Sequence, residues 1–445
     1  MDSVGFFRRM MERRRQGVAV GIPSICSASG LVLQSAFALM RHTAMPLLIE
    51  STASQVNQFG GYTGMRPKDF AEYALRLAGE ESFPAERLML GGDHLGPLPW
   101  MDRPEKEAMR LAADLVAEYV QAGYDKIHID TSMRLGDDNP RLPLSDAVIA
   151  RRGAFLCEAA ERAHAACGKE GARISPPVYV LGSEVPVPGG SRIAQDHIEP
   201  TSPEACRASI AAFREAFSRQ GIPGAWQRVI AFVVQPGVEF FAMGIHTYRP
   251  HEARHLCSVL ETQADMVFEG HSTDYQPTHC LRQMVRDGIA ILKVGPALTF
   301  AQREALCALE EIEKALFCGS GRTLSDFSAV LEHAMLQNSS HWQGYYTGNI
   351  LDQKFLRRYS FSDRSRYYLS NKAVTQSVDR LFANTESQEI PLPLISRFFP
   401  AQLADVQSGT LRPQTSALVK AYIGSRLSPY LAAAGGPQAR NRRAS

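Results

Sequence analysis

Short apolar runs recur along residues 18–315, and a stretch with helical periodicity follows each of them. The runs do not alternate strictly with polar residues, which is typical of parallel strands buried on both faces. The eight runs are 18–22, 46–50, 88–93, 126–130, 178–184, 229–235, 265–270 and 289–295. Each predicts one strand.

The clearest helix is predicted at 104–122. Apolar residues at positions 108, 112, 115, 116, 119 and 120 form one stripe, with Pro104 near its start and Gly123 just past its end. Further helices are predicted to begin near Pro67, Ser145, Ser202, Pro250, Pro277 and Thr299. Eight strand–helix repeats predict an α/β fold, a closed (β/α)8 TIM barrel rather than an open doubly wound sheet.

The strand pattern stops near residue 318. We expect residues 1–318 to form the barrel, preceded by a basic N-terminal helix, and residues 319–445 to form a C-terminal helical extension packed on it. We expect the aromatic residues of 357–368 to serve packing. The last ~12 residues are predicted to be a disordered tail.

Composition narrows the class of protein. The chain is 45% hydrophobic and 21% charged, which excludes a disordered chain, and 48 basic against 46 acidic residues give no field for nucleic acid. No run approaches the roughly 18 apolar residues of a membrane span, and no secretory signal is recognisable. Eight cysteines without a C-x-x-C pair suit reduced thiols. We therefore expect a cytoplasmic protein without membrane or nucleic-acid partners.

Polar residues gather where the predicted strands end. In a barrel of this type the active site lies at the carboxyl ends of the strands, so we expect these side chains to converge, although any single one could equally be a cap or loop residue. They are Ser24, Glu50, Asp93, His94, Asp130, Glu184, Gln235, Glu239, Glu269, His271, Asp274 and Lys293.

The pair Asp93–His94 in GGDHLGP is the most specific of these signals. A histidine there is a ready metal ligand and the adjacent aspartate a ready acid or base. With His271 opposite, and Glu184 or Glu269 completing the set, the residues suit Zn²⁺, with Mn²⁺ or Co²⁺ as alternatives. The alternative is that both histidines only bond to loop carbonyls. His128, inside its strand, is expected to be a core histidine.

The loops carry weaker signals. Residues 53–64, with Gln55 and Asn57, have the composition of a lid. Segments 271–274 and 293–296 offer Ser272, Asp274 and Lys293 to a phosphate at helix N-termini, although an N-cap role explains Ser272 equally well. Neither G-x-G-x-x-G nor G-x-x-x-x-G-K-[ST] occurs, so we expect no nicotinamide and no ATP.

The motifs ESTASQVNQFGGYTGM, GGDHLGP, KIHIDTSM, GSEVPVPGG, VVQPGVEF, EGHSTDYQ and ILKVGPALTFAQREA closely resemble the GatZ/KbaZ family. The resemblance covers residues 16–425, including YSFSDRSRYY. The family is described as the non-catalytic subunit of class II tagatose-bisphosphate aldolase, and it also resembles metal-dependent 4-epimerases of ketohexoses, their phosphates or uronates. Older labels name a tagatose-6-phosphate kinase, against which the missing nucleotide motif argues.

A more distant resemblance is to catalytic class II aldolases. It implies that Asp93 transfers protons and that His94 binds the metal, while Glu184 matches their fifth-strand glutamate. GHS at 270–272 is similar to their seventh-strand motif with the order changed. The sixth strand, VVQPG, lacks their further histidine, which leaves the third ligand open between Glu184, Gln235 and Glu269.

These resemblances imply an epimerase that interconverts D-tagatose 6-phosphate and D-fructose 6-phosphate in galactitol and tagatose catabolism. Asp93 would open the C3–C4 bond in a retro-aldol step and Glu184 would return a proton from the other face. The residues expected to bind the sugar or its phosphate are Ser24, Glu50, Gln55, Asn57, Asp130, Gln235, Ser272, Asp274 and Lys293.

Other functions stay open at this point. The chain could be a non-catalytic subunit that stabilises a separate class II aldolase, or an epimerase of free tagatose or tagaturonate. Cleavage of tagatose bisphosphate by this chain alone is a weaker alternative. The expected partners are a small sugar phosphate, with a class II aldolase subunit or a second copy of the chain as further options.

Overall fold

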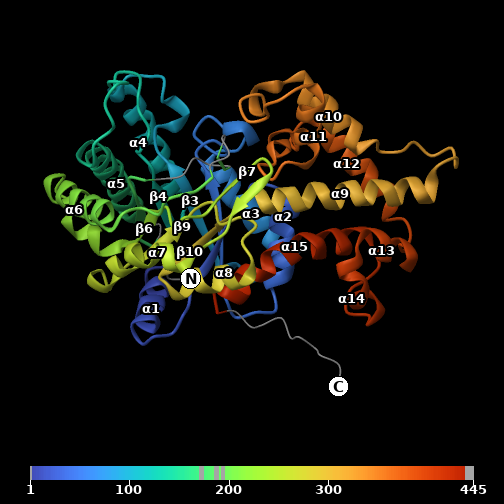
Figure 1. The fold of residues 1–445 in the computed structure, drawn as a ribbon, viewed down its shortest axis with the longest axis horizontal. Coiled ribbons are helices and arrows are strands. Elements are labelled where there is room, and N and C mark those ends of the chain that lie inside the picture. Colours follow the sequence, from blue (N-terminus) through green and yellow to red (C-terminus); the bar gives the residue numbers. More distant parts are fainter. Residues whose placement is uncertain (1–2, 170–174, 185–189, 192–195, 436–445) are drawn as a thin grey trace.

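The computed structural model, which describes residues 3–169, 175–184, 190–191 and 196–435, is built around a closed barrel of eight parallel strands (Figure 1). The strands follow one another around the barrel in chain order, and the last pairs with the first. They are β1 (Ile22–Cys26), β2 (Leu47–Thr52), β3 (Leu88–Leu95), β4 (Lys126–Ile129), β5 (Val178–Leu181), β6 (Val229–Val234), β9 (Val267–Gly270) and β10 (Ile289–Val294). The predicted TIM barrel is confirmed.

Helices connect successive strands on the outside of the barrel. They are α2 (Gly30–Met40), α3 (Pro67–Glu80), α4 (Glu105–Gln121), α5 (Asp146–Lys169), α6 (Pro203–Arg219), α7 (Pro250–Cys257) and α8 (Thr278–Arg286). The prediction of a helix at 104–122 agrees with α4, and Gly123 adopts a positive φ of 83° just past its end. An antiparallel hairpin after β6, formed by β7 (Glu239–Phe241) and β8 (Gly244–His246), was not predicted.

The first strand begins four residues later than its apolar run predicts. Residues 18–22 were expected to form it, but β1 covers Ile22–Cys26 and includes Pro23. The backbone N–H of Gly21 bonds to the carbonyl of Ala434 (3.2 Å), and a Cβ on Gly21 would lie 2.4 Å from the Ala290 oxygen. The backbone before Ile22 is therefore held by Ala434 instead of by a neighbouring strand.

An apolar plug fills the barrel at the amino ends of its strands. Helix α1 (Ser3–Arg15) lies at this end, on the side of the barrel away from β7 (Figure 1). It buries Phe7, Met10 and Met11 in one cluster with inward-facing residues of the strands, among them Leu48 and Met89. The strand ends that carry the polar residues are thus at the opposite, open end.

Helices dominate the rest of the chain. They are α9 (Pro296–Phe317), α10 (Phe327–Gln337), α11 (Ile350–Tyr359), α12 (Lys372–Thr385), α13 (Leu392–Phe398), α14 (Leu403–Gln407) and α15 (Thr415–Ala433). In Figure 1, α9 leads away from the barrel and α15 returns beside it. Because α15 contacts both α2 and α8, it occupies the place that the eighth helix takes in a simple barrel. The predicted disordered tail falls mostly on residues 436–445, which lie outside the described residues.

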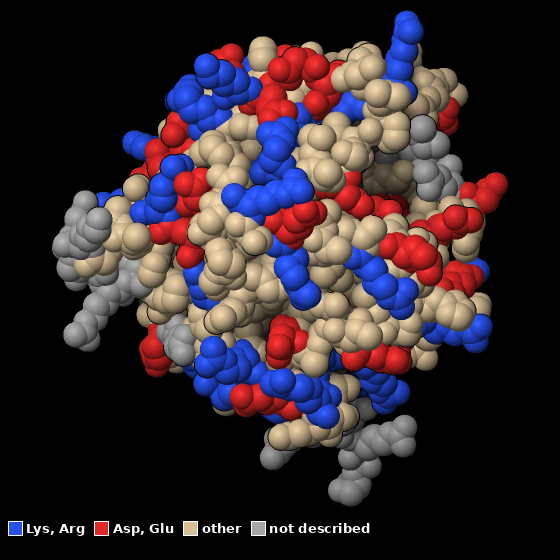
Figure 2. All heavy atoms as spheres, turned by 90° about the vertical axis from the view of Figure 1, so that its left-hand side faces the viewer, with Lys and Arg blue, Asp and Glu red and all other residues tan. Residues whose placement is uncertain are grey.

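The surface and the helices add two observations. On the face shown in Figure 2, basic and acidic side chains are interspersed, so neither sign of charge dominates that face. Among the described residues, no helix combines the length and apolarity needed to span a bilayer.

Above the apolar plug, the barrel interior contains a layer of buried ion pairs. The Lys126 ammonium, 0% exposed, lies 2.6 Å from Glu50 Oε1 and 2.8 Å from Glu269 Oε2, and both glutamates are also 0% exposed. A Cβ on Gly91 would lie 2.7 Å from Glu50 Cγ, so the absence of a side chain at this position makes room for the carboxylate. Lys126 thus holds together three strands from different parts of the chain.

We expect Lys126→Met to lower the apparent free energy of unfolding by about 3–5 kcal/mol, because two buried carboxylates lose their shared cation. Adding Glu269→Gln should recover part of this loss. Urea denaturation checks both expectations. The exposed Lys68, with Glu72 3.9 Å away, provides a matched control, since Lys68→Met should change stability by less than about 0.5 kcal/mol. Equal midpoints for the two single variants would contradict the assignment.

Candidate active site

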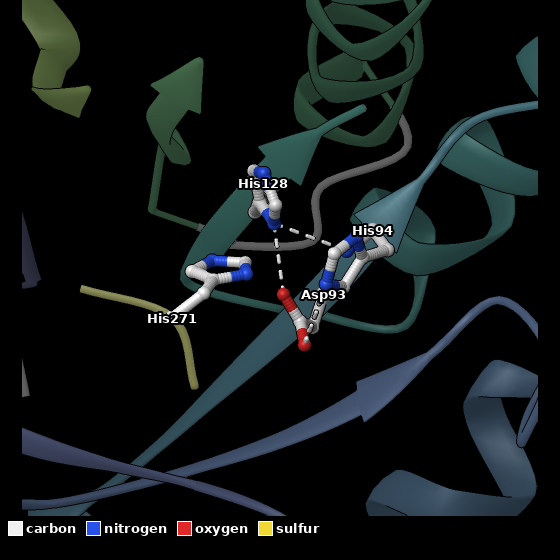
Figure 3. Close-up of side chains that lie close together, drawn as sticks. All are labelled: Asp93, His94, His128 and His271. Carbon is white, nitrogen blue, oxygen red and sulfur yellow. Dashed lines mark hydrogen bonds and ion pairs between the residues drawn. The ribbon is translucent and has the colours of Figure 1, made fainter. Parts of the chain in front are cut away.

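Four buried side chains meet at the open end of the barrel: Asp93 and His94 from β3, His128 from β4, and His271 just after β9 (Figure 3). One potential ligand atom from each lies within 4.8 Å of the others. The ring of His94 is 4.8 Å from that of His271 and 5.0 Å from that of His128, measured between centroids. Sequence positions 93, 128 and 271 are thus brought to one point by the barrel.

The backbone of β3 explains how two successive residues reach the same site. Neighbouring side chains of a regular strand point to opposite faces. His94 instead has a positive φ of 49°, and the pairing of β3 with β4 shifts register between Gly92 and Leu95. This irregularity turns the His94 ring toward the side occupied by Asp93. Its backbone nitrogen lies 3.1 Å from His128 Nδ1.

Each of the three imidazoles has one ring nitrogen against a carboxylate. The pairs are His94 Nδ1 with Asp130 (2.9 Å), His128 Nδ1 with Asp93 (2.8 Å) and His271 Nε2 with Glu269 (3.0 Å). Such carboxylates orient histidines at metal sites and leave the second nitrogen free to bind. His128 Nε2 is buried and has no hydrogen-bond partner among the described residues. The group could therefore hold a metal ion.

Electrostatics keep two of these rings neutral, which is the form that binds a metal. Burial lowers the pKa of His128 to about 4, and burial also lowers the pKa of His271. For His94, burial acts to lower the pKa, but Asp93 and Asp130 outweigh it and the pKa is raised. A proton therefore competes for His94 more strongly than for the other two rings.

Asp93 is held as a carboxylate. Burial acts to raise its pKa, but the ammonium of Lys293 and the ring of His94 hold the pKa well below its usual range. Lys293 Nζ lies 2.8 Å from Asp93 Oδ1 and also pairs with Glu50 of the ion-pair layer. The thiol of Cys26 lies 3.2 Å from Asp93 Oδ2. Asp93 is therefore an ionised, buried carboxylate at the open end of the barrel.

A cavity of about 860 Å³ opens over the group, within the range of roughly 300–1,000 Å³ for ligand sites. Its wall includes residues of the C-terminal part of the chain, from the 3-10 helix η7 (Arg364–Tyr368). The lining residues used below are Asp93, His94, His271, Lys293, Gln55, Tyr62, Ser272, Asp274, Arg76, Arg366 and Tyr367.

Several of the predicted residues contribute to the cavity or support it. Asp274 Oδ1 accepts the backbone N–H groups of Gly295 (3.1 Å) and Ala297 (2.8 Å) at the start of α9, and burial raises its pKa to about 6. The Asp274 carboxylate thus occupies the N-terminus of α9, where the sequence predicts a bound phosphate. Ser272 adopts a positive φ of 53° at the cavity wall. Ser24 is buried on β1, and its hydroxyl has no partner among the described residues.

Other predicted residues lie apart from the group. Glu184 is exposed and accepts a hydrogen bond from Thr201 Oγ1 (2.5 Å). Gln235 Oε1 accepts two backbone N–H groups two and three residues further on (2.9 Å each), and Asn57 braces its own loop in the same way. Glu239 is buried on β7, where burial raises its pKa to about 7. The contacts of Glu184, Gln235 and Asn57 are those of loop and turn residues.

Glu269 belongs to a second group of acidic side chains, with Glu50 and Asp93, that could hold a cation. Its carboxylate is already engaged by Lys126 and by His271, however, so its contacts are those of a residue that orients a histidine. His128 is buried, as expected of a core histidine, yet its Nδ1 faces Asp93 at the site (Figure 3). Lys126 and His128 occupy alternate positions of β4, and Asp130, directly after the strand, continues the alternation, which is the signal that places all three on the inward face.

Comparison with known proteins identifies the family of the chain. Residues 7–435 match the model of the family described as D-tagatose-1,6-bisphosphate aldolase subunit GatZ/KbaZ-like. A solved structure from Sinorhizobium meliloti 1021, described as a probable tagatose 6-phosphate kinase, is 41% identical, with a TM-score of 0.84, and the match covers 93% of this chain and 100% of that chain.

Two further solved structures are more distant. A fructuronate-tagaturonate epimerase from Cohnella laeviribosi is 13% identical over 94% of this chain and 82% of its own, with a TM-score of 0.45. A fructose-bisphosphate aldolase from Campylobacter jejuni is 13% identical over 86% of this chain and 94% of its own, with a TM-score of 0.40. Similarity at this level does not establish a shared activity.

The family match covers nearly the whole chain. The protein therefore belongs to the GatZ/KbaZ-like family of D-tagatose-1,6-bisphosphate aldolase subunits.

Proposed function

We propose that this protein is a metal-dependent 4-epimerase that interconverts D-tagatose 6-phosphate and D-fructose 6-phosphate in galactitol and tagatose catabolism. One observation carries the proposal: three histidines, each paired with a carboxylate, surround Asp93, and two of them, His94 and His271, line the cavity. Burying so many titratable groups costs free energy. A catalytic site explains why the protein keeps them there, whereas a purely structural role does not. The family description, which names a tagatose bisphosphate, supports the substrate class.

His94, His128 and His271 would hold the metal. Three imidazoles beside a carboxylate suit Zn²⁺ best, with Mn²⁺ or Co²⁺ as alternatives. When bound, the cation would supply Lewis-acid stabilisation of negative charge that develops on the sugar oxygens.

The residues of the chain then divide the remaining work. Asp93, kept ionised by Lys293, removes the proton of the C4 hydroxyl. The electrons of that O–H bond form the C4 carbonyl as the C3–C4 bond breaks, and the released pair forms an enediolate across C2 and C3. After the aldehyde turns over within the cavity, C3 adds to its other face and O4 recovers a proton. Because Glu184 is exposed, we assign the proton transfer to Asp93 and not to Glu184.

The direct test uses the purified chain with Zn²⁺ or Mn²⁺ and follows D-tagatose 6-phosphate by NMR. Appearance of D-fructose 6-phosphate supports the epimerase. No conversion, together with a rise in aldolase activity when a class II aldolase is mixed in, supports a non-catalytic subunit instead.

The subunit function has its own supporting observation. Helix α11 exposes Ile350, Leu351 and Phe355, which are 81%, 75% and 51% exposed. Apolar side chains gathered on one helix are typical of protein contacts. The two functions are compatible if the epimerase also binds an aldolase subunit.

We expect His128→Ala, like His94→Ala and His271→Ala, to weaken Zn²⁺ binding by about 100-fold or more, because each variant removes one imidazole from a three-histidine set. Competition with a chromogenic chelator measures the affinity, and circular dichroism confirms that the variants are folded. His251, whose side chain is 76% exposed, supplies the control variant His251→Ala, which should bind as the parent does. Unchanged Zn²⁺ affinity in His128→Ala would remove His128 from the ligand set.

We expect Asp93→Asn to lower kcat by about 10²-fold or more with Zn²⁺ content unchanged, since the amide keeps the shape of the carboxylate but cannot accept the proton. If Asp93 only braces His128, the variant should lose metal instead. Glu184→Gln is the matched control, with kcat within about threefold of the parent because that carboxylate is exposed. Near-normal turnover by metal-loaded Asp93→Asn, or a large loss in Glu184→Gln, contradicts the assignment.

A further inference from the structure

One positively charged side chain at the cavity, Arg366, takes no part in the mechanism above. Arg366 belongs to η7, more than two hundred residues beyond the strands that carry Asp93 and His128, yet it lines the same cavity. The other Lys or Arg side chains at the wall are paired: Arg76 with Glu80, and Lys293 with Glu50 and Asp93. In the part of the chain that the structure describes, no carboxylate lies within ion-pair distance of Arg366.

Arg366 is held firmly in this position. Its Nη1 donates to the backbone carbonyls of Ser362 (2.6 Å) and Asp363 (3.0 Å), and its Nη2 donates to Tyr367 Oη (3.0 Å). Arginine has five N–H donors, and those left over meet no acceptor among the described residues. A fixed, largely enclosed guanidinium with donors to spare is suited to a bound anion.

Aromatic side chains packed between the barrel and the C-terminal extension hold the residues around Arg366 in place. The Tyr367 ring stacks on His341 (centroids 4.7 Å apart, planes 8° apart) and meets the edge of Tyr62 at 5.0 Å. Tyr62 comes from the 3-10 helix η1 (Gly61–Thr63) in the loop after β2. Because Tyr62 and Tyr367 also line the cavity, Arg366 stands in a preformed wall and not on a free loop.

We propose that Arg366 binds the terminal anionic group of the substrate, so that the C-terminal extension selects a charged sugar over a neutral one. The inference rests on the proposed function for the sugar, but its physical content is binding. A guanidinium offers paired N–H donors to a phosphate or a carboxylate. The 6-phosphate of a ketohexose phosphate is the ligand we assign, and the carboxylate of a ketohexuronate shares its chemistry. The group at C6 is then held by the extension while the reacting carbons face Asp93.

The test measures binding by calorimetry, independently of turnover, in the zinc-loaded protein. The ligands are D-tagatose 6-phosphate, D-tagatose and D-tagaturonate. Arg366→Gln should raise the Kd of the phosphorylated sugar about 10–100-fold and leave that of D-tagatose unchanged, as expected for loss of a charge-assisted contact. Arg366→Lys should recover part of the affinity. The exposed Arg358 gives the control Arg358→Gln, which changes net charge equally and should bind as the parent does.

Each outcome is decisive. Equal weakening for D-tagatose and its phosphate would mean a structural role and overturn the inference, as would no change at all. A selective loss for D-tagaturonate instead of the phosphate keeps the anion site but assigns it to a carboxylate. If binding depends on Arg366 but the NMR assay shows no conversion, the proposed epimerase activity is overturned and the anion site stands. If conversion occurs and does not depend on Arg366, the anion site is overturned and the epimerase activity stands.

A measurement on the unaltered protein covers the case in which the variants do not fold. Phenylglyoxal modifies accessible guanidinium groups, and peptide mass spectrometry locates the label. Inorganic phosphate should protect Arg366 and not Arg358. Equal labelling of Arg366 with and without phosphate overturns the inference.

Discussion

The pairing of carboxylates with lysines inside the barrel is the interaction on which the rest of the site depends. Glu50, Asp93 and Glu269 share the ammonium groups of Lys126 and Lys293, with the deepest members fully enclosed. Charges in such surroundings are tolerated only when each has a partner, so the set must assemble together or not at all. Three carboxylates against two ammonium groups leave one negative charge, which favours a cation among the neighbouring imidazoles.

The same layer sets the state of the residues above it. Lys293 links the layer to Asp93 and keeps that carboxylate ionised, while Glu269 links it to His271. Reactivity at the cavity therefore depends on the buried ion pairs beneath it. The extension completes the arrangement from the other side, because Arg366 and Tyr367 close a wall that the barrel alone leaves unfinished.

The sequence predicts the barrel well because buried parallel strands have a simple apolar pattern. It locates Asp93, His94 and His271 because the ends of the predicted strands can be recognised in the sequence. It does not identify His128, since a polar residue within an apolar run resembles a core histidine until its alternation with Lys126 is considered. The sequence also predicts Glu184 and Gln235 at the site, because loop caps and catalytic groups use the same residue types. The contribution of η7 depends on packing between distant segments, which no local pattern encodes.

Helix α15 has a consequence for the order in which the protein is made. It is the last helix among the described residues, and it fills the gap between α2 and α8, the first and seventh helices around the barrel. Its Tyr430 hydroxyl donates to the carbonyl of Thr273 (2.6 Å), in the loop that begins with His271. During synthesis, the ring of helices therefore cannot be completed, nor that loop supported, until α15 has emerged from the ribosome, well after the last barrel strand. The barrel strands are thus synthesised well before the helix that completes their covering, so the growing chain exposes apolar surface in the interval.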